Sequence, residues 1–416
     1  MKVPDEIEVI VKLTERCNIN CTYCYMFNKG NDEYLSRPAY MSEQTATALA
    51  EFLAQAAEAF ALKKIRVIFH GGEPMMMKPD RFERICEVLD EAISPFAELE
   101  LAMQTNAMLV SDAWLNALIT HDVGIGVSID GPPKYHDVDR VDHKGGSTYD
   151  DVVTGLRRLQ AAADKGLLRP VGSISVIRPS FDGAEVYRHL ANDLGIRSLN
   201  FLLPIDTYDT FDFKDVDGYG KFMRDVYKEW VSQGDSRVRV RFVDDYLRFL
   251  HGGADAAKSR LDHLNSMAFF VVGSNGDIEP DDSLKPIHPD VFGRWNVAST
   301  TLSDYINQPS IQAVFAETAV LPQECRDCSW RNVCRGNAGR AITRYSMSKG
   351  FAQKSFLCEP IKRVYSYIAA SALQSGLTHD ALMAAIQPHA EEVSSDDVKL
   401  VQTSSRPPVT WMKSLA

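Results

Sequence analysis

Six short β-rich runs, separated by helical patterns, constrain the fold of this 416-residue chain more than any other feature. Amphipathic patterns fill most of the gaps. In residues 42–60, for example, Ser42 can cap a helix whose apolar residues share one face. Strands that alternate with helices form a parallel sheet, and six units are too few for a closed eight-stranded barrel. We therefore expect an α/β fold with an open sheet and its functional groups at the carboxyl ends of the strands. The runs are residues 7–13, 65–70, 99–105, 123–129, 171–177 and 198–203.

Composition and charge exclude several classes of protein. An apolar content of 45% suits a large globular domain with a smaller second one. The chain has no uncharged apolar run of 18 residues, and its first residues lack a signal-peptide pattern, so we expect a cytoplasmic protein without a membrane partner. A formal net charge of −11 argues against a nucleic-acid partner, which would require a basic face.

Three cysteines follow the first expected strand in a C-x3-C-x2-C spacing, Cys17, Cys21 and Cys24. Eight cysteines placed at random in 416 positions would give this pattern only about 0.003 times per chain. Three thiolates on one loop can hold three irons of a cubane cluster and leave the fourth iron open. The alternative is zinc, but a tetrahedral zinc site needs a fourth ligand, and no further Cys or His occurs before His70.

Polar groups also occupy the ends of the next three expected strands. Gly71-Gly72-Glu73-Pro74 offers glycines that permit close backbone approach and a carboxylate for an ammonium group, although it also suits a simple turn. Asn106 can cap a turn, and Ser128 is a strand-end hydroxyl. Arg140 can bind a carboxylate in a bidentate manner or form a surface ion pair with Asp137 or Asp139.

These motifs resemble those of the radical S-adenosyl-L-methionine (SAM) superfamily, with Ala107 in place of the usual glycine after Asn106. The resemblance implies an open partial (β/α)6 barrel. It also implies that Cys17, Cys21 and Cys24 hold a [4Fe–4S] cluster that cleaves SAM to a 5'-deoxyadenosyl radical. The residues that it assigns to cofactor binding are Tyr23, Tyr25, Gly71, Gly72, Glu73, Pro74, Asn106, Ser128 and Arg140.

A second cysteine group, Cys325, Cys328, Cys334 and Cys358, suits either zinc or an iron–sulfur cluster by spacing alone. Its position behind the barrel resembles the SPASM domain, which carries two auxiliary clusters. Ala338 replaces one ligand of the inner cluster, and the others are also missing, so the resemblance implies two [4Fe–4S] clusters in total. The remaining cysteine, Cys86, lies on an apolar helical stripe and is expected in the core.

Four segments are expected along the chain. Residues 1–204 form the barrel, 205–266 a bridging region with a helix near 219–232, 267–375 a SPASM-like domain, and 376–416 a C-terminal helix and polar tail. A hairpin over 268–279 opens the third segment, with its turn at Ser274-Asn275-Gly276-Asp277. Because the first strand begins by Ile7, we expect a leader peptide to be recognised by the bridging region, the C-terminal domain or a separate protein.

Beyond Cys334, residues 335–351 and the following Phe356-Leu357-Cys358 resemble the C-terminal ending of maturases that crosslink side chains in ribosomal peptides, with Arg335-Gly336-Asn337 in place of the usual glycine run. This resemblance implies hydrogen abstraction from a precursor peptide, giving a crosslink or another oxidative change, with an external electron donor of the flavodoxin or ferredoxin type. Asp282 is a candidate base, although Asp277, Asp281 and Asp282 read more readily as a solvated acidic turn. Further pocket candidates are Tyr208, Tyr219, His136 and Arg344.

Three alternatives remain open from the sequence. The same scaffold supports action on a small molecule, because a fold does not determine a substrate. An iron–sulfur electron carrier or redox sensor is a second alternative, although it would not need the Gly71-Gly72-Glu73 motif. Maturation of a sulfatase is a third, and the missing ligands of the inner cluster speak against it.

Overall fold

A nine-stranded sheet forms the framework of the protein in the computed structural model, with strand order β7-β6-β5-β4-β3-β2-β1-β8-β9. The structure describes residues 3–264, 267–285, 287–288 and 291–386, so most of the expected polar tail lies outside the described residues. Strands β1 to β6 are parallel and match all six expected runs. Their bounds are Glu6–Thr14, Lys64–Gly71, Glu98–Thr105, Gly124–Ser128, Gly172–Val176 and Ser198–Leu202.

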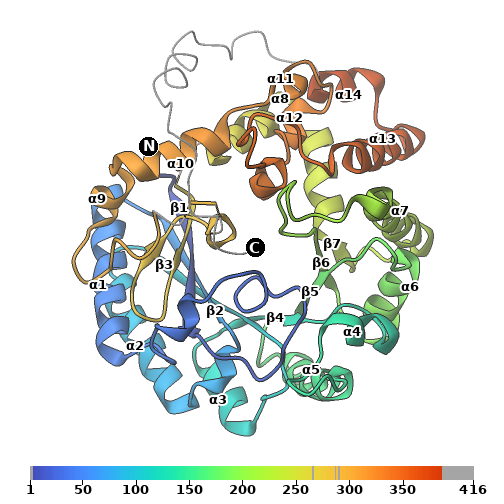
Figure 1. Ribbon diagram of the computed structural model, residues 1–416. Helices are drawn as coiled ribbons and strands as arrows, with labels where there is room; N and C mark the ends of the chain where they lie inside the picture. Colours follow the sequence, from blue (N-terminus) through green and yellow to red (C-terminus); the bar gives the residue numbers. More distant parts are fainter. Residues whose placement is uncertain (1–2, 265–266, 286, 289–290, 387–416) are drawn as a thin grey trace, which may run out of the picture.

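Helices cover the outer face of this curved sheet (Figure 1). Ser42 caps the first of them as expected, because its hydroxyl accepts a 2.9 Å hydrogen bond from the Thr45 amide. Parallel strands with one helical layer outside confirm the open α/β barrel. The helices are α1 (Glu43–Phe60), α2 (Pro79–Ile93), α3 (Asp112–Thr120), α4 (Pro133–Asp139), α5 (Tyr149–Ala163) and α6 (Gly183–Arg188).

Burial alternates along the barrel strands and shows which side chains face the interior. Val67 and Phe69 of β2 are fully buried, and Phe69 packs edge-on against Phe82 of α2 at 5.0 Å between ring centroids. Ile68, which lies between them in β2, is only half-buried. Because successive strand residues point to opposite faces, the half-buried ones line an accessible barrel interior. His70 therefore faces this interior.

The expected bridging region contains more structure than its sequence suggested. Helix α7 (Val216–Gln233) is the expected one, but β7 (Arg239–Val240) extends the sheet and is followed by a long helix, α8 (Arg241–Leu264). The expected hairpin is present as β8 (Phe269–Val272) and β9 (Ile278–Glu279), and β8 pairs parallel to β1. The sheet thus continues across the expected boundary at residue 267, and the four-segment division stays a prediction.

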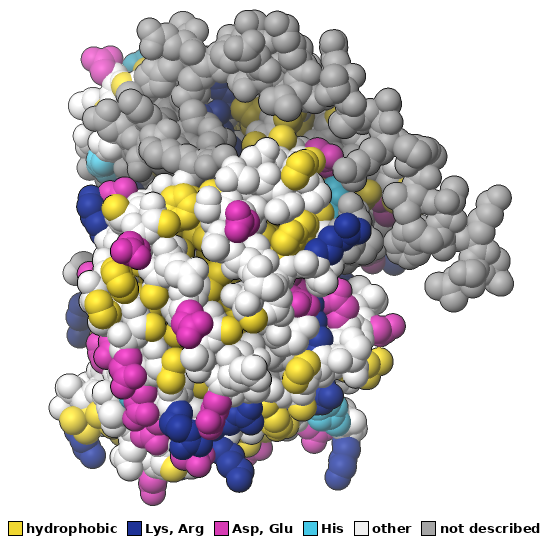
Figure 2. All heavy atoms as spheres, turned by 90° about the vertical axis from the view of Figure 1, so that its left-hand side faces the viewer, with side chains coloured by type: hydrophobic (Ala, Val, Ile, Leu, Met, Phe, Trp, Pro, Cys, Tyr) yellow, Lys and Arg dark blue, Asp and Glu magenta, His cyan; other side chains and the backbone are white. Residues whose placement is uncertain are grey.

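Six further helices complete the described chain. Figure 2 shows acidic and basic side chains mixed over the face that carries α1, as on an ordinary solvated surface. A search of the described helices finds none with the length and apolarity to cross a membrane. The further helices are α9 (Leu302–Ile306), α10 (Pro309–Ala319), α11 (Gln323–Arg326), α12 (Arg331–Cys334), α13 (Cys358–Gln374) and α14 (His379–Ile386).

Candidate active site

The loop that carries Cys17, Cys21 and Cys24 leaves the carboxyl end of β1 and is tied to the connection after α4. The Asn20 amide donates to the Val141 carbonyl at 2.8 Å, and the Thr22 hydroxyl donates to the Asp139 carboxylate. Burial raises the pKa of Cys17 to about 12 and that of Cys21 to about 11. Thiols that burial keeps protonated are deprotonated by a bound metal, so the three residues fit an iron–sulfur group chemically.

Gly71 ends β2, Gly72 follows it, and both pack against the backbone at the start of this loop. A Cβ atom on Gly71 would lie 2.2 Å from the Thr14 carbonyl oxygen, and one on Gly72 would lie 2.0 Å from that of Arg16. The Gly72 amide donates to the Thr14 carbonyl at 2.9 Å. The glycines thus allow contact with the chain's own cysteine loop, which brings Glu73 close to the cysteines.

Glu73 is 1% exposed and held by three donors. One carboxylate oxygen accepts from the Thr105 hydroxyl at 2.7 Å and the Met75 amide at 3.0 Å, and the other accepts from the Asn106 amide at 2.7 Å. Burial raises the pKa of Glu73 despite these donors. Each oxygen can accept more than one hydrogen bond, so a cationic ligand would relieve the cost of burying this carboxylate. Pro74, also buried, opens the short turn after Glu73.

Asn106 directly follows β3, and Ser128 is the last residue of β4. The Asn106 amide nitrogen donates to Asn18 in the cysteine loop at 2.7 Å, and its oxygen caps the turn that follows. Ala107 takes a φ of 61°, a left-handed conformation that explains why glycine suits this position in the motif. The Ser128 hydroxyl accepts from Gln104 at 2.7 Å and is half-buried at the interior face.

Arg140 and Tyr23 form a buried polar chain with Asp130. The Arg140 guanidinium donates to the Tyr23 hydroxyl at 2.9 Å, which donates to Asp130 at 2.7 Å. Burial raises the pKa of Asp130 to about 6, although Arg140 opposes this. The expected alternative, an Arg140 ion pair with Asp137 or Asp139, is not found, because Asp139 pairs with another arginine at 2.5 Å. The Nε of Arg140 is buried without a partner among the described residues, so the guanidinium can still bind an anion.

Asp282 lies inside the barrel mouth, and the expectation of a solvated acidic turn is wrong for this residue. It is 9% exposed, accepts from the Tyr25 hydroxyl at 2.8 Å and lies 3.1 Å from the Lys12 ammonium. Burial alone would raise the pKa of Asp282, but Lys12 and the Tyr25 hydroxyl hold it below its usual value. Asp277 instead meets Arg37 at 3.7 Å. The hairpin thereby delivers an ionised carboxylate next to the tyrosine that follows Cys24.

Lys12 and His70 are site residues that the sequence reasoning missed. They lie opposite each other in the β1–β2 register, so their side chains share the interior face. Lys12 is 1% exposed, and its pKa is raised because Asp282 and Glu279 outweigh the effect of burial. The Nδ1 of His70 is buried without a partner in the described part of the chain, and burial lowers the pKa of its imidazole. The available sequence signal for Lys12 was a lysine within an otherwise apolar strand.

The other pocket candidates have structural partners. His136 is fully buried, accepts from the Asp130 amide at 3.4 Å and contacts the Thr148 hydroxyl at 3.1 Å. Arg344 is also fully buried and donates to the carbonyls of Thr318 and Val320. The Tyr208 hydroxyl donates to a backbone carbonyl at 2.8 Å, and Tyr219 is 8% exposed. These hydrogen bonds account for the burial of His136 and Arg344 within the fold.

Comparison with known proteins agrees with this geometry. Residues 11–180 match the model of the radical SAM superfamily. The chain contains a radical SAM domain. The cysteine-type anaerobic sulfatase-maturating enzyme of Clostridium perfringens (strain 13 / Type A) is 22% identical over 365 residues, which cover 84% of this chain and 93% of that protein.

Two solved structures share the fold. Native anSMEcpe with bound AdoMet and Kp18Cys peptide superposes with a TM-score of 0.73 at 19% identity, covering 89% of this chain and 99% of that one. SuiB of Streptococcus suis, bound to precursor peptide SuiA, gives 0.57 at 13% identity, covering 86% and 76%. The matched region extends beyond the radical SAM domain into the C-terminal part, which supports the expected SPASM-like fold there.

A radical SAM domain uses a [4Fe–4S] cluster and SAM, and the second cysteine group offers another site. Cys325, Cys328, Cys334 and Cys358 line one cavity of about 70 Å³ between α11, α12 and the start of α13. Burial raises the pKa of Cys325 to about 11 and that of Cys334 to about 12, so these thiols also fit a metal group. Cys86 is fully buried in α2, as expected.

Proposed function

We propose that this protein is a peptide maturase that uses its radical SAM domain to abstract hydrogen from a side-chain or backbone carbon of a ribosomally made precursor peptide. The observation that carries the proposal is the ionised Asp282 carboxylate beside Tyr25, at the mouth of the barrel. A carrier of electrons alone would not need a proton acceptor there. Several of the matched proteins are anaerobic sulfatase-maturating enzymes, and the matched structures include complexes with peptides, which supports a peptide substrate over a small molecule.

The cofactors have defined places in this proposal. Cys17, Cys21 and Cys24 hold the [4Fe–4S] cluster, and the Glu73 carboxylate holds the SAM ammonium. When bound, the two cofactors supply a 5'-deoxyadenosyl radical that takes a hydrogen atom from the substrate. The Arg140 Nε has no partner among the described residues and could donate to a carboxylate. The remaining proposed cofactor residues are Tyr23, Tyr25, Gly71, Gly72, Pro74, Asn106 and Ser128.

The chain's own residues then handle the proton. Asp282 accepts a proton from the substrate after the hydrogen atom has left, because Lys12 keeps the carboxylate ionised. Tyr25 holds the carboxylate in place through its hydrogen bond. Loss of one hydrogen atom, one proton and one electron oxidises the substrate by two electrons. That electron leaves to an external one-electron acceptor, and an external donor of the flavodoxin or ferredoxin type supplies the electron that SAM cleavage consumes.

The C-terminal cysteines hold a second [4Fe–4S] cluster in this proposal, in preference to zinc. Their cavity of about 70 Å³ is about five times the space that one water molecule needs, which exceeds the needs of a single ion. Within the described residues, no group of three or more Cys, His, Asp or Glu side chains is arranged around a single metal ion. Each thiolate of a cubane binds its own iron, so the thiols of such a site stand further apart.

The bond formed distinguishes two candidate reactions. We propose a crosslink between side chains as the product. The second candidate is oxidation of a Cys or Ser side chain, which the match to a sulfatase-maturating enzyme favours. The missing inner-cluster ligands speak against it.

Anaerobic reconstitution with iron and sulfide, followed by dithionite, SAM and a precursor peptide encoded beside this gene, tests the proposal. We expect 5'-deoxyadenosine and a peptide that has lost two hydrogen atoms, and Cys17→Ala should form neither. An aldehyde-reactive hydrazide separates the candidate products, because only an oxidised Ser or Cys side chain reacts. Failure to cleave SAM under any reductant would refute the enzyme, whereas cleavage without change to any encoded peptide would favour a small-molecule substrate.

A further inference from the structure

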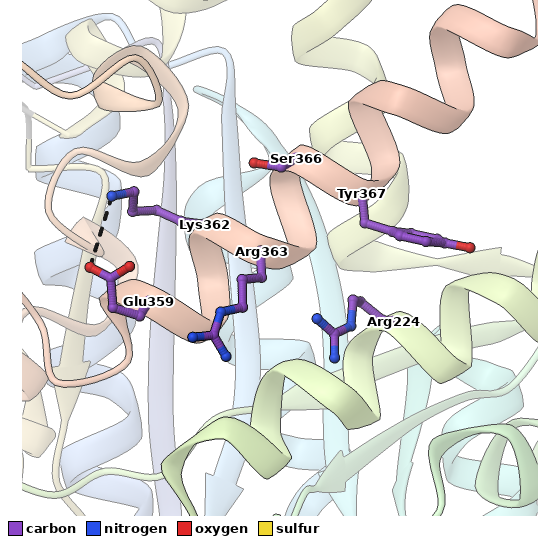
Figure 3. Close-up of a pocket in the computed structure, with 6 residues that line it drawn as sticks. All are labelled: Arg224, Glu359, Lys362, Arg363, Ser366 and Tyr367. Atoms are coloured by element: carbon purple, nitrogen blue, oxygen red, sulfur yellow. Dashed lines mark ion pairs between the residues drawn. The ribbon is translucent and has the colours of Figure 1, made fainter.

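A surface hollow of about 520 Å³ lies between α7 and α13, outside the barrel (Figure 3). Arg224 from α7 and Arg363 from α13 extend into the space between the two helices, with Tyr367 further along α13. The walls are fixed, because a Cβ atom on Gly220 of α7 would already lie 3.0 Å from Pro360 of α13. The two helices that flank the hollow are therefore closely packed at this point.

The side chains of the hollow carry an excess of positive charge. Arg224 is half-buried and forms no hydrogen bond or ion pair with any residue that the structure describes. Arg363 pairs with Asp217 at 2.9 Å, and Lys362 lies 3.8 Å from Glu359. Residues lining the hollow and the adjacent cysteine cavity include five cations and two carboxylates, and with Asp217, the partner of Arg363, the net charge is +2 on a chain of −11. The cations are Arg224, Arg331, Lys354, Lys362 and Arg363; the carboxylates are Glu324 and Glu359.

The hollow is continuous with the C-terminal cysteine site. Glu359 and Lys362 line both spaces, and α13 begins at Cys358, one of the four cysteines. Tyr367 is nine residues further along, which is about 14 Å at the rise of an α-helix. Every part of the hollow on α13 thus lies close to a ligand of the proposed second cluster.

We propose that this hollow docks a small acidic one-electron carrier protein, beside the second cluster. The inference rests on the proposed function only in that the four cysteines hold an iron–sulfur group. Arg and Tyr are the residue types most enriched at interface hot spots, and Tyr367 is 38% exposed with the Lys228 ammonium 5.4 Å from its ring. A local basic surface overcomes the repulsion between two acidic proteins and speeds their encounter. One electron passes from the reduced carrier to the cluster, with no bond made or broken.

Binding of a purified bacterial flavodoxin to the reconstituted protein tests this inference. Calorimetry under anaerobic conditions compares the wild type with the double variant Arg224→Glu and Arg363→Glu over a series of salt concentrations. The control is Lys63→Glu with Lys165→Glu, which changes the net charge equally at exposed positions near the amino ends of the strands. We expect the hollow variant to raise the Kd at least about tenfold at low salt and the control to change it less than about twofold.

Further readouts separate docking from a structural effect. 5'-Deoxyadenosine formation driven by dithionite should be equal in all variants, whereas formation driven by reduced flavodoxin should fall only in the hollow variant. If the charge-reversed variant does not fold, the double variant Arg224→Gln and Arg363→Gln repeats the test. An unchanged Kd in the hollow variant, or an equal loss of flavodoxin affinity in the hollow and control variants, would overturn the inference. So would a loss of precursor-peptide affinity with flavodoxin affinity intact, since the hollow would then bind the substrate. Because flavodoxin binding needs no peptide, the result stands even if no peptide is modified.

Discussion

Replacing Lys12 by glutamine should move the acidic limb of the pH–rate profile to higher pH. Asp282 accepts a proton only when it is ionised, so the rate falls as the pH drops below its pKa. In the wild type this pKa lies below its usual value of about 4, and Asp282 contributes no limb above that pH. Without the Lys12 ammonium, burial dominates and raises the pKa. The variant therefore loses activity at low pH and recovers it as the pH rises.

The size of the shift follows from the geometry. The Lys12 ammonium lies 3.1 Å from the Asp282 carboxylate, which corresponds to about 5 kcal/mol at an effective dielectric constant of about 20, or about 4 pH units. This is an upper bound, because Glu279 shares the ammonium at 3.8 Å and water can enter the space left by the ammonium. We expect a shift of at least about one unit.

The assay is the rate of peptide modification between about pH 4 and pH 9, which covers a limb raised by one unit from below about 4, on enzyme matched for iron content. Matching is needed because removing one partner of a buried ion pair costs about 3–5 kcal/mol of stability. Lys29→Gln is the control, since it removes an equal charge from a more exposed pair with Asp206, also at 3.1 Å. A Lys12→Gln profile that coincides with that of the wild type would refute the role of Asp282 as base.

Three further predictions concern the cofactor sites. Cys358→Ala should lower the iron content from about eight to about four per chain while SAM cleavage continues; iron analysis that shows zinc instead would refute the second cluster. Gly72→Ala should prevent reconstitution of the first cluster, because its Cβ would overlap the Arg16 carbonyl, and the absorbance of the reconstituted protein measures this. Glu73→Gln should weaken SAM binding at least about tenfold and cost about 1–3 kcal/mol of stability, since an amide NH2 must face the Asn106 amide or the Thr105 and Met75 donors; equilibrium dialysis and thermal unfolding report the two effects.

The barrel could be predicted from sequence because its signals are local. Each of the six strands is a short apolar run next to a helical pattern, and alternation alone determines parallel pairing. The cysteine spacing and the Gly-Gly-Glu turn follow strand ends, so their proximity follows from the topology. The reason for the glycines could not be predicted, because Gly72 contacts Arg16, and these residues are far apart in the sequence.

The bridging region shows why other parts were missed. Helix α8 contains Gly252 and Gly253, which each cost about 1 kcal/mol in a helix interior and mask the pattern. Val243, Tyr246 and Leu250 nevertheless recur at helical spacing and are buried. Tertiary packing outweighs the local preference there.

The burial of Asp282 was missed for a similar reason. Asp281 and Asp282 follow a turn and read as solvated by composition alone. Asp282 is buried because a lysine 270 residues away in the chain, Lys12, lies within reach of its carboxylate. Charge pairs of this kind become visible only once the sheet order is known.

The pairing of β8 with β1 has a consequence for how the protein is made. Glu8 meets Phe269 across the sheet, so β1 cannot complete its hydrogen bonds until more than half of the chain has left the ribosome. During this interval the loop with Cys17, Cys21 and Cys24 lacks the contact that Asp282, just after the hairpin, makes with Tyr25. Iron–sulfur assembly should therefore follow synthesis of the hairpin, and chains arrested before residue 269 should acquire no stable first cluster.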